Sequence, residues 1–233
     1  MRGMNSGATG KYSIDLVFVI DTTGSMGSVI AEVKVLVQGF SDRLRSVMAN
    51  EGKEMQDLWV RIVTFRDLGE EGSRAISASH FYELPEQEEA LREFVGGLSP
   101  AGGGDEPESG LEALWLAMRS PWRNVLRSRH IIVMLTDAPA HNLGKYEYPK
   151  DLFQDAVLPP GNLHEMKKYW GISPDSGVMN AQARRLIIFA PDANPWNEIG
   201  ERWENTVSVQ SRAGEGLIDT ELETILKTIA KSV

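Results

Sequence analysis

The sequence predicts a doubly wound α/β domain, in which a mostly parallel sheet carries helices on both faces. Strand-like apolar runs alternate with helix-periodic segments along the 233 residues, as in parallel strands joined by crossover helices. The strongest runs are apolar throughout, which is typical of strands buried on both sides. No internal repeat, low-complexity tract or clear linker interrupts this order, so one domain is the simplest account.

Six apolar runs are the expected strands. The run HIIVMLT is the most strand-like of them, and the run ASHFYEL is the weakest. In chain order the six runs cover 13–20, 58–65, 78–84, 130–136, 184–190 and 206–209.

The expected helices are indicated by apolar residues spaced three or four positions apart. A continuous stripe from Met26 to Val47 predicts one long helix after the first strand. Thr220 and Glu223 have the spacing of a capping box for the last helix. The shorter helices are expected within 86–98, around Leu111–Met118, near 194–204 and around Leu222–Ile229.

Two segments stand apart from this regular order. Residues 1–12 are small and polar, lack the apolar middle of a signal peptide and are expected to be a flexible lead-in to a single domain at 13–233. Residues 138–184 are long for a connection between two strands, so we interpret them as an insert. The insert is either a recognition surface that sets partner choice or a self-packed structural element. The recognition surface is suggested by its aromatic residues, which are Tyr146, Tyr148, Phe153, Tyr169 and Trp170.

Composition limits the partners and the compartment. The formal net charge of −9 disfavours nonspecific binding to nucleic acid or to an acidic membrane, because their phosphates would repel the chain. The chain has no cysteine, which excludes disulfides, thiolate zinc sites and a thiol nucleophile. No stretch approaches the roughly 18 apolar residues of a membrane helix. We therefore expect a cytoplasmic protein without direct membrane insertion.

Three loops carry acidic and hydroxyl side chains. DTTGS at 21–25 follows the first strand, TDAPAH at 136–141 ends the strand at 130–136, and GGGDEPES at 102–109 leads into a helix. Ligands of open α/β sheets bind outside the carboxyl ends of the strands. Asp21 and Asp137 should therefore lie close together if their strands are neighbours, and Asp105 could approach the same edge.

This combination of residues predicts a site for a hard cation. Alternate side chains of an extended segment point the same way, so Asp21, Thr23 and Ser25 converge while Thr22 faces away. Carboxylates held close together are costly without a cation. Oxygen ligands without cysteine or well-spaced histidine favour Mg²⁺, Ca²⁺ or Mn²⁺ over Zn²⁺.

DTTGS at the end of the first buried strand resembles the D-x-S/T-x-S motif of the von Willebrand factor A (vWA) domain. LTDAPAH is similar to a later element of the same family, which places its Asp at Asp137. The resemblance implies a six-stranded, Rossmann-like sheet with one divalent ion at its top, in a metal-ion-dependent adhesion site. It implies that Thr23 and Ser25 contact the ion through hydroxyls, and that Asp21, Asp105 and Asp137 hold it directly or through water.

The middle loop departs from the adhesion-receptor pattern, which usually has Thr where this chain has Asp105. In this respect the chain is similar to bacterial A domains of the tellurite-resistance type, and to those of hemicentins and alpha-type kinases. An added carboxylate would bind the ion more firmly, with less need of a partner's carboxylate.

Each of these residues also has a structural interpretation. Asp21 and Thr23 suit an N-cap for a helix at Met26, and Asp105 suits a cap for a helix at Glu108. Asp137 before Ala-Pro suits a turn. Two further residues have two interpretations each. Asp67 is either an outer-shell group or a solvated loop charge, and His141 is either part of the rim of the site or a plain loop residue.

The predicted function is a divalent-metal-dependent protein interaction module that binds an acidic group of another protein, with no catalytic residues. The alternative is a metal-dependent phosphohydrolase or phosphotransferase. Phosphatases with an aspartyl nucleophile place a second acid two residues later, and that position here is Thr23. Ser25 also lacks the G-x-S-x-G frame of a nucleophile elbow. A third possibility is a metal site with only a structural role.

Overall fold

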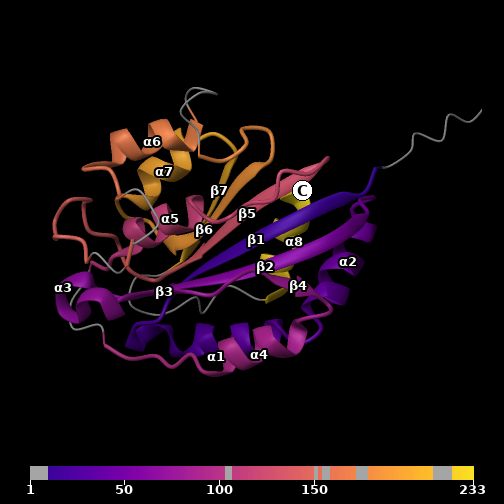
Figure 1. Ribbon diagram of the computed structural model, residues 1–233, viewed down its shortest axis with the longest axis horizontal. Helices are drawn as coiled ribbons and strands as arrows, with labels where there is room; N and C mark the ends of the chain where they lie inside the picture. Colours follow the sequence, from indigo (N-terminus) through magenta and orange to yellow (C-terminus); the bar gives the residue numbers. More distant parts are fainter. Residues whose placement is uncertain (1–9, 103–106, 150–151, 154–157, 172–177, 212–221) are drawn as a thin grey trace, which may run out of the picture.

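The strands that the structure describes form a seven-stranded sheet in the order β3-β2-β1-β5-β6-β7, with β4 pairing β2 beside β3. The computed structural model describes residues 10–102, 107–149, 152–153, 158–171, 178–211 and 222–233 (Figure 1). Each strand of the central group is parallel to its neighbours. These strands are β1 (Tyr12–Asp21), β2 (Met55–Phe65), β5 (Ser128–Leu135), β6 (Arg184–Pro191) and β7 (Thr206–Ser211).

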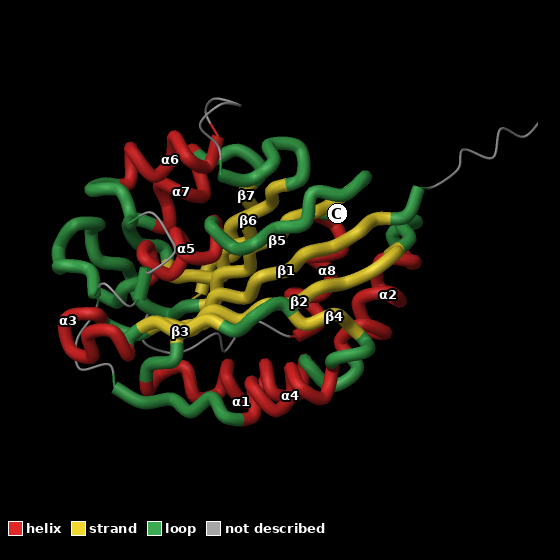
Figure 2. Tube along the Cα trace, viewed as in Figure 1, coloured by secondary structure: helices red, strands yellow, loops and turns green. Residues whose placement is uncertain are grey.

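The sheet is covered by helices on both faces, so the predicted doubly wound α/β architecture is confirmed (Figures 1 and 2). One face carries α1 (Gly27–Leu36), α2 (Phe40–Asn50), α4 (Glu88–Gly96) and α8 (Leu222–Ser232). The other face carries α3 (Leu68–Glu71), α5 (Gly110–Met118), α6 (Leu163–Gly171) and α7 (Trp196–Arg202).

The central strand β1 shows why its sequence has no polar alternation. Leu16 and Phe18 pack into the core on the α1 side, whereas Val17 and Val19 pack into the core on the α5 side. Both sets of side chains are buried, as the apolar run predicts.

The expected strand at 78–84 is wrong as a single element. It divides into β3 (Ile76–Ala78) and β4 (Tyr82–Leu84), which pair antiparallel with different parts of β2. Ser79 makes the division, because its hydroxyl accepts the N–H of Ile62 and its own N–H donates to the carbonyl of Ile62. The described residues therefore form seven strands rather than the six expected, and β3 and β4 share one edge of the sheet.

The expected continuous helix from Met26 to Val47 is also wrong. A short 3₁₀ turn at Gly24–Met26 leads into α1, which ends at Leu36, and α2 begins only at Phe40. Gly39 separates them with φ of 65°, a left-handed conformation that ends a right-handed helix. Its N–H donates to Oε1 of Glu88, which ties the break to α4.

Parts of the remaining expectations lie outside the described residues. These are residues 1–9 of the lead-in and Thr220 of the capping box. The insert at 138–184 contains a helix, α6, that its sequence did not suggest. Among the described residues, no helix combines the length and the apolar character needed to cross a membrane.

Candidate metal centre

The pairing of β1 with both β2 and β5 places the loops that carry the predicted ligands at one edge of the sheet. Asp21, the last residue of β1, is in register with Phe65 at the end of β2. On the other side Ile20 is in register with Leu135, two residues before Asp137. The carboxyl ends of β1 and β5 therefore lie side by side, which is the condition for Asp21 and Asp137 to lie close together.

Asp21 is the buried centre of this edge, with no exposed surface. Its Oδ1 accepts hydrogen bonds from the backbone N–H of Thr23 at 2.9 Å and from the hydroxyl of Thr23 at 2.6 Å. Its Oδ2 accepts the hydroxyl of Thr136 at 2.8 Å. Thr23 is the N-cap residue of the following 3₁₀ turn by position, as the structural interpretation expects, but its hydroxyl donates to Asp21 and makes no capping bond to that turn.

Ser25 and Asp137 complete a chain of polar contacts from the interior to the surface. The hydroxyl of Ser25 donates to Oδ1 of Asp137 at 3.1 Å and lies 3.5 Å from the hydroxyl of Thr23. Asp137 and Thr23 are buried, whereas Ser25 is exposed. The structure therefore brings Asp21, Thr23, Ser25 and Asp137 together. The fifth predicted ligand, Asp105, lies in 103–106, outside the described residues.

The loop that leads to Asp105 approaches the same edge. The N–H of Gly24 donates to the carbonyl of Gly102 at 3.2 Å, and the N–H of Ala101 donates to the carbonyl of Thr22 at 3.1 Å. The side chain of Thr22 points away from the cluster, as expected, and donates to the carbonyl of Phe65. The helix that follows this loop begins at Gly110 with Ser109 as its N-cap residue, so the expected helix start at Glu108 is wrong.

Burial makes the negative charge of Asp21 unfavourable. It raises the pKa of Asp21 to about 6; the hydrogen bonds from Thr23 and Thr136 oppose that rise, and the negative charge of Asp137 adds to it. A cation between the two carboxylates would offset both unfavourable effects.

The oxygen atoms of the cluster fit a hard divalent cation. Two carboxylates and two hydroxyls are donors of the kind that Mg²⁺, Ca²⁺ and Mn²⁺ prefer. Within the described ranges, no group of three or more His, Cys, Asp or Glu residues is placed to hold a metal.

Thr136 is a member of the cluster that the sequence did not identify. Its hydroxyl also receives the N–H of Ala138 at 3.1 Å, so it fixes the turn that carries Asp137 as well as the carboxylate of Asp21. Its position directly before Asp137 was the available signal, but a β-branched residue at the end of a strand has an ordinary structural explanation.

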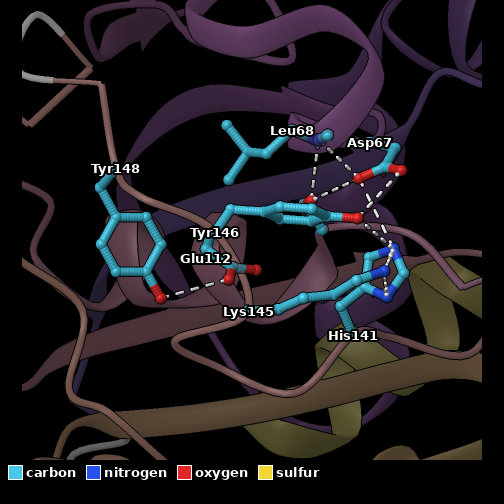
Figure 3. Close-up of polar contacts among 9 residues, drawn as sticks. Asp67, Leu68, Glu112, His141, Lys145, Tyr146 and Tyr148 are labelled. Carbon is cyan, nitrogen blue, oxygen red and sulfur yellow. Dashed lines mark hydrogen bonds and ion pairs between the residues drawn. The ribbon is translucent and has the colours of Figure 1, made fainter.

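Asp67 belongs to a different polar cluster, which Figure 3 shows. Its Oδ1 accepts the N–H of Gly69 at 2.9 Å, which caps α3, and lies 3.5 Å from Nε2 of His141. The hydroxyl of Tyr146 lies 3.5 Å from Oδ2 of Asp67 and 3.3 Å from Nε2 of His141. Within the described residues Asp67 makes no hydrogen bond to the predicted ligands. Asp67 caps α3 and anchors the loop of His141 and Tyr146, and because it is buried the interpretation as a solvated loop charge is wrong.

The aromatic residues of the insert face the protein interior. Phe153 and Trp170 are buried, and Tyr146, Tyr148 and Tyr169 are partly buried against the core on the α5 side. For the described part of the insert, the structure therefore favours the self-packed alternative over an exposed aromatic recognition surface.

The sequence profile of the von Willebrand factor A domain matches residues 15–156, which is more than half of the chain. The chain therefore belongs to the von Willebrand factor A domain family. No curated protein matches the chain by sequence.

Solved structures with this fold include the pilus adhesin SpaC from Lactobacillus rhamnosus GG. One crystal structure of SpaC matches with 13% identity and a TM-score of 0.51, over 94% of this chain and 30% of the adhesin chain. Its open conformation matches with 14% identity and a TM-score of 0.50, over 94% and 29%. The chain thus spans about a third of the length of the adhesin, and at this identity the likeness shows the fold alone. Proximal thread matrix protein 1 from the mussel byssus gives 13% identity and a TM-score of 0.47, over 95% and 48%.

Proposed function

We propose that this vWA domain is a protein interaction module that depends on a divalent cation. Asp21, Thr23, Ser25, Asp105 and Asp137 would hold one Mg²⁺, or Ca²⁺ or Mn²⁺ in its place. The bound ion would supply a positive charge that accepts an acidic side chain from another protein. The observation that carries this proposal is the hydrogen-bonded cluster of buried Asp21, Thr23 and Asp137 with exposed Ser25, at the ends of two neighbouring strands.

The protein's own groups would orient the ligands before the ion arrives. Thr136 and the backbone N–H of Thr23 hold the carboxylate of Asp21 in place from two sides. Ser25 is the exposed member, so a partner would approach the cluster from its side. The likeness to tellurite-resistance-type domains depends on Asp105 and stays a prediction, as does a cytoplasmic location.

Calorimetric titration with MgCl₂ and MnCl₂ tests the metal. We expect binding of one ion per chain to the native protein and at least a hundredfold weaker binding to Asp21→Asn, which keeps the shape of the side chain and removes its charge. We expect Ser25→Ala to weaken binding as well. Ser28→Ala, which removes an exposed hydroxyl outside the cluster, is its matched control and should leave binding unchanged. Absence of binding to the native chain would end the proposal of a metal site.

Capture of partners from extracts of the source organism, with MgCl₂ or with a chelator, tests the interaction. We expect proteins that are retained with Mg²⁺ and released by chelation, and that are lost with Asp137→Asn. Metal binding without any metal-dependent partner would leave the ion with a structural role only.

The phosphohydrolase alternative is not favoured by any contact within the described residues. The groups that contact Asp21 there are the hydroxyls of Thr23 and Thr136 and a backbone N–H, none of which is an effective general acid. Turnover of a generic phosphate ester with Mg²⁺, abolished by Asp21→Asn, would favour the enzyme instead.

A further inference from the structure

A cavity lies between α6, the end of α7 and the first residue of β6. Its volume is about 290 Å³, and its described lining residues are Lys167, Trp170, Gly171, Arg184, Arg202 and Glu204. Three of these six residues are cationic, although the chain as a whole carries a net charge of −9. The cavity exceeds the roughly 30 Å³ share of one water several times, so it has room for a polyatomic ion.

Arg184 is the buried cation of this cavity, with only 1% of its surface exposed. Its Nη2 donates to the carbonyl of Gly171 at 3.2 Å and to Oε2 of Glu204 at 3.3 Å. Within the part of the chain that the structure describes, its Nε and Nη1 have no hydrogen-bond partner. A guanidinium stays charged in proteins, and buried N–H groups without acceptors are unfavourable. Arg184 therefore has unused donor capacity in a side chain that lines an open volume.

The surrounding residues hold the guanidinium in place. Its Cζ lies 5.5 Å from the centre of the Trp170 ring, and Trp170 in turn donates from Nε1 to the carbonyl of Glu204 at 2.8 Å. A Cβ on Gly171 would lie 2.5 Å from Nη1 of Arg184. Only glycine at 171 leaves room for the guanidinium in this position, so Gly171 and Trp170 together fix the guanidinium at the wall of the cavity.

Glu204 does not neutralise this site effectively. Its side chain is 80% exposed, whereas that of Arg184 is 2% exposed. An exposed carboxylate is well solvated and loses little when it leaves such a contact. Among the described residues, Arg202 pairs with Glu198, one helical turn away at 3.3 Å on an exposed face. The described lining of the cavity therefore has an excess of positive charge.

We propose that this cavity binds a small oxyanion, a phosphate or carboxylate group, with Arg184 as the buried ligand and Lys167 and Arg202 at the more exposed side. Arg184 begins β6, whereas the candidate metal centre lies at the carboxyl ends of β1 and β5. The two sites therefore lie at opposite ends of the parallel strands. The proposed oxyanion site does not depend on the proposed metal site.

Calorimetric titration of the full chain with sodium phosphate, sodium sulfate and sodium acetate, at constant ionic strength and without divalent metal, tests this site. We expect one bound anion per chain. Affinity should fall at least tenfold in Arg184→Lys and several-fold in Lys167→Gln and in Arg202→Gln. Arg92→Gln on α4 removes the same charge from an exposed position on the other face of the sheet, and should leave the affinity unchanged. Tighter binding of phosphate than of acetate would indicate a phosphate-bearing ligand, and the reverse would indicate a carboxylate-bearing ligand.

Two results would overturn the proposal. One is the absence of binding of all three anions to the native chain. The other is an equal loss of affinity in Arg92→Gln, which would indicate diffuse attraction by charge. If Arg184→Lys does not fold, the double variant Lys167→Gln/Arg202→Gln replaces it, because its changes lie nearer the surface.

Discussion

Glu112 is a buried acid outside the candidate metal centre. It has no exposed surface, and its Oε1 accepts the hydroxyl of Tyr148 at 3.3 Å (Figure 3). Among the described residues, its Oε2 has no hydrogen-bond partner. Burial raises the pKa of Glu112 from 4.5 to about 7, the bond from Tyr148 opposes the rise, and the charge of Asp67 adds to it. The folded protein therefore holds this proton to a higher pH than the unfolded chain does.

This difference makes stability depend on pH with a definite sign. Because the folded state binds more protons between pH 4.5 and 7, the contribution of Glu112 to the free energy of unfolding falls as pH rises through that window. The total loss is about 3 kcal/mol, and it is complete above pH 7. Glu112→Gln cannot ionise. We expect its stability relative to the native protein to increase by about that amount from pH 4.5 to pH 7.5.

Urea unfolding of both proteins across this pH range checks the prediction. Glu70→Gln, an exposed change of the same kind on α3, is the control and should show a much smaller trend. A difference between Glu112→Gln and the native protein that does not change with pH would contradict a raised pKa at Glu112.

At the scale of elements, Gly39 turns one predicted helix into two. Its φ of 65° is unfavourable for a residue with a Cβ, yet no atom lies within 4 Å of where that Cβ would be. The cost of Gly39→Ala therefore comes from the backbone conformation alone. We expect a loss of about 1–2 kcal/mol in the free energy of unfolding.

The matched control for this change is Gly96→Ala in α4. There too no atom lies near the added Cβ, but the backbone is helical, so we expect no loss and a gain of up to about 1 kcal/mol. Equal effects of the two substitutions in urea unfolding would show that the conformation at Gly39 is not the cause of the break between α1 and α2.

The same glycine shows why the sequence predicted some elements better than others. The long strands were predictable because their apolar runs are buried on both faces, as in β1 and β5. The break at Gly39 was not, because Val37 and Phe40 on either side remain buried and preserve helical spacing across it. An isolated glycine in a helical pattern is often tolerated, so the pattern alone does not reveal a left-handed residue.

The candidate site was predictable only in part for a related reason. Asp21 and Asp137 were identified as strand-end acids, but their proximity depends on β1 lying next to β5, and strand order is not encoded in local spacing. Asp67 has the same sequence signature at the end of β2. Its partners, His141 and Tyr146, come from a loop whose path no periodicity predicts.

At the scale of the whole molecule, an ion at the candidate metal centre should stabilise the entire fold. A ligand that binds only the folded state at about 100 times its Kd adds about 2.7 kcal/mol to the free energy of unfolding. For a chain of 233 residues this corresponds to a rise in Tm of roughly 5–10 °C.

Scanning calorimetry with increasing MgCl₂ measures this shift. We expect Asp137→Asn to remove it, while NaCl of equal ionic strength gives no comparable rise in Tm. A rise of equal size in native and Asp137→Asn proteins would place the stabilising ion elsewhere.

The hydrogen bond between Thr136 and Asp21 joins residues 115 positions apart in the chain. During synthesis the first half of the cluster leaves the ribosome well before the second, so a nascent chain carries Asp21 for a time without its partners from β5. Contacts of such high sequence separation form late, after the intervening loop has closed. Uptake of a cation during refolding would therefore mark the moment at which β5 docks beside β1. An incomplete chain that lacks β5 would not bind a partner through this site.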